Sequence, residues 1–230
     1  MNALIFQLVL EAIESKRTVA VVTDTDTGGQ CILDGEKKTG QLTLSDDQCA
    51  RIADMIVSDR SGMLGESNVF VRVYGPPLRM IVVGAVHIAQ VLAPMAQLAG
   101  FDVTVIDPRE GFATAGRMAD FDTVTMWPDE GMELLKPDAR TAVVTLTHDP
   151  KLDDPALQAA LKSDAFYIAS LGSTRTHAKR LQRLRSDGFS DEQLSRIHGP
   201  AGLNIKALTP AEIAVSILSQ AVAVRRGAIT

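Results

Sequence analysis

From position 79 onward, the sequence alternates short runs of Val, Ile and Leu with longer stretches of helical periodicity. Apolar runs without polar alternation are buried on both faces, which is typical of parallel strands covered by helices. The sequence therefore predicts an α/β domain with a doubly wound, Rossmann-type parallel sheet. Strands are expected at 79–83, 102–106, 123–126, 141–146 and 165–169, and helices at 87–99, 129–135, 155–162, 175–185 and 211–225.

The region before position 78 has a different pattern and is expected to be a small α+β domain. Asp34-Gly35 favours a hairpin with a type I′ turn, because both central residues of that turn need positive φ. Gly75-Pro76-Pro77 interrupts the pattern, since two successive prolines cannot join a sheet ladder, and predicts domains at 1–77 and 78–230. The N-terminal domain is expected to hold a first amphipathic helix, strands at 17–23, 30–33 and 68–74, and a helix at 46–57 capped by Ser45.

The composition argues against several classes of function. With 23 Lys and Arg against 28 Asp and Glu, the chain has a net charge of -5 and no basic footprint for nucleic acid. No run approaches the roughly 20 apolar residues of a membrane span, and no basic region precedes the apolar N-terminus, so the protein is predicted to be cytoplasmic. Cys31 and Cys49 stand apart without a CxxC pattern, which favours two inert thiols over a metal site or a disulfide.

The clearest motif lies where the first strand of the α/β domain meets its helix. Gly84-Ala85-Val86-His87-Ile88-Ala89 occupies the position of the dinucleotide fingerprint GxGxxG/A, with Val86 in place of the middle glycine. Asp107 closes the next strand, where an acidic side chain can accept hydrogen bonds from a ribose, and Arg109 follows it. The alternative is that Gly84 only allows a tight turn and that Asp107 caps the next helix.

Two later strands also end in polar groups. Thr147-His148-Asp149 follows the fourth strand, and Gly172-Ser173-Thr174-Arg175 follows the fifth. Ligands of open α/β sheets bind beyond the carboxyl ends of the strands, so Gly84, Asp107, His148, Gly172 and Arg175 are expected to line one crevice. Backbone N–H groups at a helix start, together with the Arg175 side chain, would suit a phosphate. The alternative for His148 is a turn residue that bonds its own backbone.

Basic residues continue along the helix that follows Arg175. His177, Lys179, Arg180, Arg183 and Arg185 are interpreted as a solvated face, with a phosphate patch as the alternative. The stretch 196–205, which contains His198, is rich in Gly and Pro and is interpreted as a long connection that is either functional or a spacer. It leads to the last helix, whose start at Thr209-Pro210-Ala211-Glu212 has the pattern of a capping box.

These motifs together resemble the xanthine dehydrogenase accessory family, the XdhC and CoxI group. The resemblance rests on GAVHIA, VIDPREGFA, LTHDPKLDDPAL, YIASLGSTRTHAKRL and RIHGPAGLNIKALTPAEIAVSI, which stand in the family's order. It implies a maturation factor, rather than an enzyme, that binds the molybdenum cofactor as molybdopterin or molybdopterin cytosine dinucleotide. The implied partners are a cysteine desulfurase, which supplies sulfur to the cofactor, and the apo-enzyme of a xanthine or carbon monoxide dehydrogenase; a homodimer is left open.

Strand-end reasoning and resemblance together give one set of candidate binding residues and no catalytic or metal-ligating residue. The cofactor-binding set is Gly84, Val86, His87, Asp107, Arg109, Thr147, His148, Asp149, Gly172, Ser173, Arg175 and His198. Val86 departs from the family pattern, and the chain lacks the family's GGC motif after Gly40. An NAD(P)-dependent oxidoreductase is the alternative, although Val86 should obstruct a pyrophosphate and no Tyr-x-x-x-Lys pair is present. A binding module without catalysis is a third hypothesis.

Overall fold

The computed structural model describes residues 3–109 and 121–229, which form two compact units, Met1–Pro76 and Pro77–Thr230. The end of the VIDPREGFA segment, from Glu110 on, lies outside the described residues. None of the helices within the described ranges is long and apolar enough to cross a membrane.

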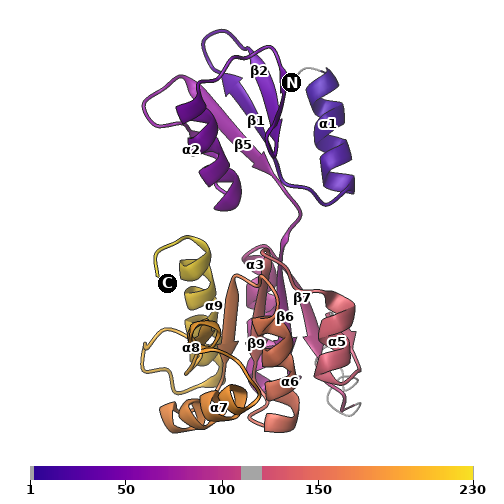
Figure 1. Cartoon of the computed structure of the whole chain (residues 1–230), viewed down its shortest axis with the longest axis vertical. Helices are drawn as coiled ribbons and strands as arrows, with labels where there is room; N and C mark the ends of the chain where they lie inside the picture. Colours follow the sequence, from indigo (N-terminus) through magenta and orange to yellow (C-terminus); the bar gives the residue numbers. More distant parts are fainter. Residues whose placement is uncertain (1–2, 110–120, 230) are drawn as a thin grey trace. The chain divides into compact units, whose positions relative to one another are not determined.

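The N-terminal unit is a five-stranded antiparallel sheet in the order β3-β2-β1-β5-β4, and Figure 1 labels three of these strands, β1, β2 and β5. Helices α1 and α2 cover opposite faces of this sheet, because Val21 packs in the cluster that contains Ile5 of α1 and its neighbour Val22 packs in the cluster that contains Ile52 of α2. The elements are α1 Ala3–Glu14, β1 Val19–Asp24, β2 Gln30–Asp34, β3 Lys37–Gly40, α2 Asp46–Val57, β4 Gly62–Met63 and β5 Val69–Tyr74.

The local signals of this unit have mixed outcomes. Ser45 caps α2 as predicted, and its side chain accepts a hydrogen bond from the backbone N–H of Gln48. The hairpin after Asp34 is present between β2 and β3, but the predicted type I′ turn is wrong. Asp34 pairs with Lys37, so the central residues are Gly35 and Glu36, and only Gly35 has positive φ. That pattern belongs to a type II′ turn, which needs glycine at its first central position only.

The C-terminal unit is the predicted parallel α/β sheet. All six strands run parallel, in the order β11-β10-β9-β6-β7-β8. Numbered within this unit, the order is 3-2-1-4-5-6, which is the order of dinucleotide-binding Rossmann folds. The strands are β6 Leu78–Val83, β7 Phe101–Ile106, β8 Asp122–Val124, β9 Thr141–Thr145, β10 Tyr167–Ser170 and β11 Ile197–His198.

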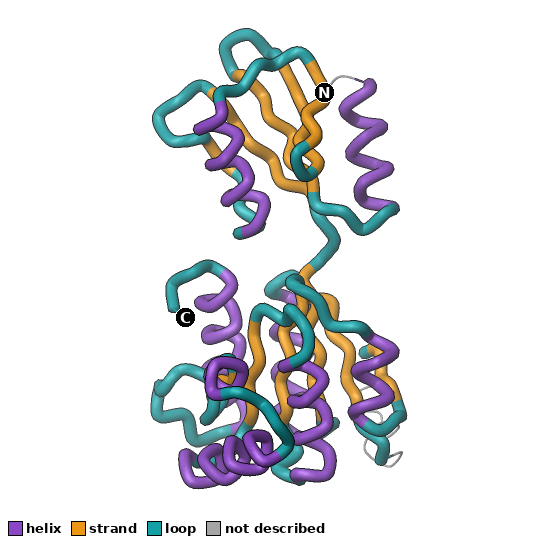
Figure 2. Tube along the Cα trace, in the orientation of Figure 1, coloured by secondary structure: helices purple, strands orange, loops and turns teal. Residues whose placement is uncertain are grey.

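Helices enclose this sheet from both sides, as Figure 2 shows. One buried cluster joins the sheet to Leu92 of α3 and Ile217 of α9, and the other joins it to Leu157 of α6 and Leu184 of α7. In β6, β9 and β10, successive apolar residues enter different clusters, so these strands are apolar on both faces, and this explains their unalternated apolar runs. The helices are α3 His87–Leu98, α5 Pro128–Leu135, α6 Pro150–Leu161, α7 Thr174–Ser186, α8 Asp191–Ser195 and α9 Pro210–Arg225.

Three elements of this unit differ from the expectation, and one of them, the short helix α8, has no counterpart among the predicted helices. Helix α6 begins at Pro150, five residues before the predicted start at Pro155, because Asp149 caps it and a proline suits the first helical position. The sequence interpretation also missed β11, which consists of Ile197 and His198 and lies within the predicted long connection. A two-residue edge strand has too few positions to produce a readable pattern. Thr209 and Glu212 form the expected capping box at the start of α9.

Candidate functional site

The turns after β6 and β9 meet at the centre of the sheet edge. These strands are neighbours in the sheet, yet α3 and α6, which follow them, cover opposite faces. Gly84 has φ of +108°, and a Cβ at this position would lie 2.6 Å from Cγ2 of Thr147. Glycine is therefore required both by the backbone conformation and by the close approach of the second turn. Ligands of open α/β sheets bind at such switch points.

Asp107 lies beside this switch point, and it is fully buried. Its Oδ2 accepts hydrogen bonds from the backbone N–H of Ala85 at 2.8 Å and from Nη2 of Arg109 at 2.8 Å, and its Oδ1 accepts from the backbone N–H and Nε of Arg109. Burial opposes ionisation, but the hydrogen bonds from Arg109 and Ala85 outweigh it and hold the pKa of Asp107 below its ordinary value. The carboxylate thus joins the β6 and β7 turns and has its donors within the chain.

The two other candidates in this corner lie at the start of α3. Val86 is the N-cap residue, with an extended backbone and no side-chain capping bond. Its side chain is half-buried against the cluster that contains Leu92. His87 is the first residue of the helix and is exposed. Valine thus occupies the helix start at which the fingerprint has its second glycine.

The β9–α6 turn is held by its own side chains. Asp149 caps α6, and its Oδ1 accepts a hydrogen bond from the backbone N–H of Lys151 at 2.9 Å. Oγ1 of Thr147 donates to Oδ1 of Asp153 at 2.7 Å. His148, between them, has φ of +63° and an exposed side chain. Positive φ in a residue that is not glycine is uncommon and is concentrated at functional turns.

The β10–α7 turn brings the remaining strand-end candidates close to that loop. Gly172 has φ of +142°, and a Cβ there would lie 3.1 Å from Cγ2 of Thr176. Ser173 caps α7 by accepting a hydrogen bond from the backbone N–H of Thr176 at 3.2 Å. Arg175 follows in the first turn of the helix, and its side chain is exposed.

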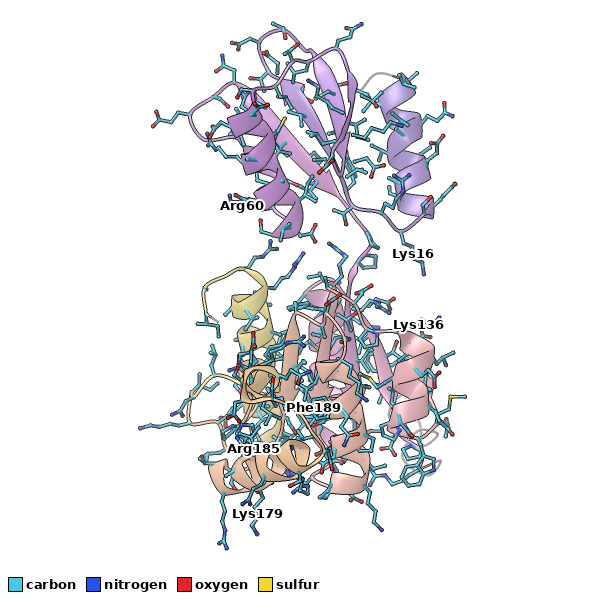
Figure 3. All side chains as sticks on the ribbon, viewed as in Figure 1. Lys16, Arg60, Lys136, Lys179, Arg185 and Phe189 are labelled. Atoms are coloured by element: carbon cyan, nitrogen blue, oxygen red, sulfur yellow. The ribbon has the colours of Figure 1, made fainter. Side chains whose placement is uncertain are left out.

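The solvated face predicted along α7 is wrong for two residues: His177 is half-buried, with its Nδ1 shielded from water, and Arg180 is buried. Its side chain is only 2% exposed, beside the equally buried Asp153, and Nη2 of Arg180 lies 3.6 Å from Oδ2 of Asp153. The same Nη2 donates to the carbonyl oxygen of Leu171 at 2.9 Å. The physical reason is helical spacing: Arg180 is four residues before the buried Leu184, so both side chains lie on the inner face of α7. Lys179 and Arg185, also on α7 (Figure 3), are exposed as predicted.

Burial shifts both partners of this pair towards their neutral forms. Burial lowers the pKa of Arg180, against the opposing effect of the Asp153 carboxylate. It also raises the pKa of Asp153, although hydrogen bonds from Thr147 and the charge of Arg180 oppose the rise. Removing charged groups from water is costly unless they are paired and hydrogen-bonded. In the described part of the chain, Nε and Nη1 of Arg180 have no hydrogen-bond partner, and neither has Oδ2 of Asp153.

A cavity of about 280 Å³ lies over this pair, between the start of α6 and the first turns of α7. It brings His148 and Arg175 together, although they follow different strands. Four lining side chains are cationic, and the one carboxylate is that of Asp153. The lining residues are His148, Pro150, Asp153, Arg175, Thr176, Lys179, Arg180 and Arg183.

A second cavity, of about 490 Å³, borders the other side of the β10–α7 turn. Gly172 and Thr174 line it, together with residues 200–204, 206 and 207 and two residues of α9, Ile213 and Ser216. The predicted connection therefore forms part of a hollow, and Lys206 is its only cationic lining residue among those described.

Not all candidates converge on one space. Gly84 and Asp107 border the switch point but line neither of these two cavities. His198 lies farther away, in the edge strand β11, where it pairs with Ala169 and its ring stacks on Tyr167 with centroids 5.0 Å apart. Burial lowers the pKa of His198. Sequence reasoning missed Asp153 as a site residue; its spacing from the buried Leu157, four positions later on α6, would have placed it on the inner face.

The strand order and the strand-end turns define a Rossmann-type α/β domain, and its cationic cavity lies beside the switch point. Residues 80–221 match the XdhC Rossmann domain, and the chain therefore belongs to the XdhC family. Among the described residues, no group of three or more His, Cys, Asp or Glu side chains could hold a metal ion.

Relatives with curated descriptions support the same family. The chain is 33% identical over 152 residues to the molybdenum cofactor insertion chaperone PaoD of Escherichia coli, which covers 66% of this chain and 42% of PaoD. It is 30% identical over 176 residues to the uncharacterized protein YqeB of the same organism, covering 76% of this chain and 32% of YqeB. One probable xanthine dehydrogenase subunit of Bacillus subtilis is 30% identical over 161 residues, covering 70% of this chain and 47% of that protein. The chain thus spans less than half the length of each of these three relatives.

A solved structure has the same fold along almost the whole chain. It is a xanthine dehydrogenase from Bacillus halodurans, with a TM-score of 0.72 and 22% sequence identity, and the match covers 99% of this chain and 65% of that one. At this identity, the likeness concerns the fold alone.

Proposed function

We propose that this protein binds the molybdenum cofactor and delivers it to an apo-enzyme of the xanthine or carbon monoxide dehydrogenase type, without turnover of its own. The family and the 33% identity to an insertion chaperone support this function. The structural observation that carries it is the cationic cavity at the strand ends, with the buried Arg180 as its least exposed cation. Molybdopterin carries a phosphate and its cytosine form a pyrophosphate, so the donor set of the cavity fits the anionic part of either.

The partners follow from the same proposal. A cysteine desulfurase would supply the terminal sulfur while the protein shields the cofactor, and a molybdenum hydroxylase apo-enzyme would then receive it. Cys31 is buried, and burial raises the pKa of its thiol, so it is a poor nucleophile for sulfur transfer. Sulfur is therefore expected to come from the desulfurase and not from a thiolate at Cys31.

An NAD-dependent oxidoreductase is the competing function, and the paired state of Asp107 weighs against it. Both carboxylate oxygens accept hydrogen bonds from Arg109, and one also accepts from Ala85, so a ribose hydroxyl would have to displace a donor. Losing a hydrogen bond to a charged group costs about 1.5–3 kcal/mol.

Native mass spectrometry of the full chain with molybdopterin, molybdopterin cytosine dinucleotide and NAD in parallel tests the proposal. A one-to-one complex with either molybdopterin form and none with NAD is expected. The loaded protein should then activate a purified molybdenum hydroxylase apo-enzyme faster than free cofactor does. A complex with NAD alone would overturn the proposal in favour of the oxidoreductase.

A further inference from the structure

The buried Arg180 has more hydrogen-bonding capacity than the chain uses. Its Nη2 donates to the carbonyl oxygen of Leu171 and faces Asp153, whereas Nε and Nη1 have no partner within the described residues. A guanidinium carries five N–H donors in a fixed fork, and buried donors are almost always satisfied. Unpaired donors on a side chain that is 2% exposed, at the wall of a cavity, indicate a ligand.

The other charges around the cavity show which kind of ligand this is. Arg183 is neutralised by Asp154, whose Oδ1 accepts from Nη2 of Arg183 at 2.9 Å. Arg175 and Lys179 stand one helical turn apart on α7, and neither forms an ion pair with a described residue. The local charge is positive even after Asp153 has offset Arg180, so an anion is favoured.

The structure also shows why Asp153 does not close the site. Its Oδ1 is held by the hydroxyl of Thr147, and its Oδ2 faces the Nη2 edge of Arg180. The hydrogen bond from Nη2 to the carbonyl oxygen of Leu171 therefore holds one edge of the guanidinium, Asp153 offsets its charge from 3.6 Å, and Nε and Nη1 are left as donors. Arg is the side chain best suited to phosphate, since its planar fork can donate two parallel hydrogen bonds.

We infer that the cavity between α6 and α7 is a phosphate site, in which Arg180, Arg175 and Lys179 bind the phosphate monoester or diphosphate of a ligand at the strand ends. Its volume of about 280 Å³ is at the small end of ligand sites and suits one charged group better than a whole dinucleotide. The inference of a phosphate site depends only on the side chains that line the cavity. The further step, that the bound phosphate belongs to the molybdenum cofactor, rests on the proposed function.

Calorimetric titration of the full chain with inorganic pyrophosphate tests the site without the cofactor. Saturable one-to-one binding is expected, weakened about tenfold or more by Arg175→Ala or by Lys179→Ala, since each removes a charged hydrogen-bond donor. Arg185→Ala is the matched control, because Arg185 lies on the same helix, pairs with Asp191 and does not line the cavity. It should change the affinity less than twofold. Equal weakening by all three variants, or no saturable binding, would overturn the site.

Arg180 itself is tested by Arg180→Lys, which keeps the charge and removes the fork. If circular dichroism shows a folded variant, pyrophosphate affinity should fall at least tenfold, and unchanged affinity would contradict the role of Arg180. If the variant does not fold, the exposed Arg175 and Lys179 variants decide the question.

A separate titration tests whether the phosphate bound in this cavity is that of the molybdenum cofactor. Molybdopterin is titrated before and after removal of its phosphate with alkaline phosphatase. The phosphorylated form should bind the wild type at least tenfold more tightly, and Arg175→Ala should abolish the difference. Pyrophosphate binding that depends on Arg175, without any binding of molybdopterin, would support the site and overturn the proposed function. A molybdopterin affinity that changes neither on phosphatase treatment nor in Arg175→Ala would support the proposed function and overturn the phosphate site.

Discussion

Two corners of the same sheet edge differ in how their polar groups are paired. At the ends of β6 and β7, Asp107 is buried and satisfied, with donors from Arg109 and Ala85. At the ends of β9 and β10, Arg180 is equally buried, but two of its nitrogens have no partner within the described residues. The first corner contains the recognisable dinucleotide fingerprint, and the second contains the cationic cavity.

The difference shows that the residues of a recognisable sequence motif and the residues available to bind a ligand need not be the same. Asp107 occupies the place of a ribose-binding carboxylate, yet its hydrogen bonds tie two turns of the fold together. Arg180 occupies an ordinary helix position and yet presents buried, unused donors to a cavity. A buried polar group that is satisfied contributes to the fold, whereas an unsatisfied one at a cavity wall indicates a ligand.

The largest expected effect comes from breaking the buried pair of the second corner. Arg180→Met should lower the free energy of unfolding by about 3–5 kcal/mol at pH 7, because it leaves Asp153 buried without a cation. Burial already raises the pKa of Asp153, and loss of Arg180 raises it further, so the folded state takes up a proton more readily than the unfolded one. The difference in the free energy of unfolding between the wild type and Arg180→Met should therefore shrink as the pH falls towards the raised pKa of Asp153. Urea unfolding at several pH values measures this.

Two further variants control that prediction. Arg180→Met combined with Asp153→Asn should recover most of the lost stability at pH 7, because the amide oxygen can still accept from Thr147 and no charge is left unpaired. Arg185→Met, on the exposed side of α7, should change stability by no more than about 0.5 kcal/mol. A deficit independent of pH would show that lost packing, and not the charge of Asp153, is responsible.

A smaller effect is expected in the first corner. Asp107→Asn should cost about 1.5–3 kcal/mol at pH 7, since it weakens hydrogen bonds to a charged acceptor. The pKa of Asp107 is lowered in the folded protein, so its contribution is present above the unfolded value of about 3.9 and is lost as the pH falls through the folded pKa. The difference between wild type and variant should thus narrow below about pH 4. Asp102→Asn, an exposed carboxylate of β7, is the control, and an equal loss there would contradict the assignment.

The smallest effect concerns NAD and Val86. A side chain at the second fingerprint position occupies the space through which a pyrophosphate approaches the backbone, and valine has few rotamers to vacate it. Calorimetry should find weak or no binding of NAD by the wild type. Val86→Gly should raise the affinity for NAD by less than about tenfold, or 1.4 kcal/mol, because Asp107 stays hydrogen-bonded to Arg109. Tight binding by the wild type, little altered by the glycine, would refute the steric argument.

Most of the C-terminal fold could be predicted from sequence because its signals are local. Apolar runs gave β6, β7 and β9 nearly to the residue, and Thr209 marked the start of α9. Errors fell where two local signals compete or where an element is very short. The predicted helix start at Pro155 is wrong because Asp149-Pro150 carries the stronger capping signal. The missed strand β11 has only two residues.

The candidate site was less predictable, because a site is defined by contacts between separate loops. Topology alone allowed the expectation that His148 and Arg175 approach each other, and they line one cavity. The sequence places His198 in a connecting loop, but His198 lies in an edge strand and its ring stacks on Tyr167. The run of charges predicts a solvent-exposed Arg180, because charge runs are usually solvated, and only its spacing from the buried Leu184 indicates the inner face of α7.

The sequence by itself determined the strand pattern, the capped helix starts and the polar groups at the strand ends, since each depends on residues within a few positions of one another. Only the tertiary structure decided which polar groups are satisfied. The hydrogen-bonding capacity of Asp107 is filled and that of Arg180 is not. This difference depends on atoms of Ala85, Leu171 and Asp153, which are remote in the chain or belong to another element. The free energy of a buried charge is set by the neighbours that surround it in space, and sequence order does not specify them.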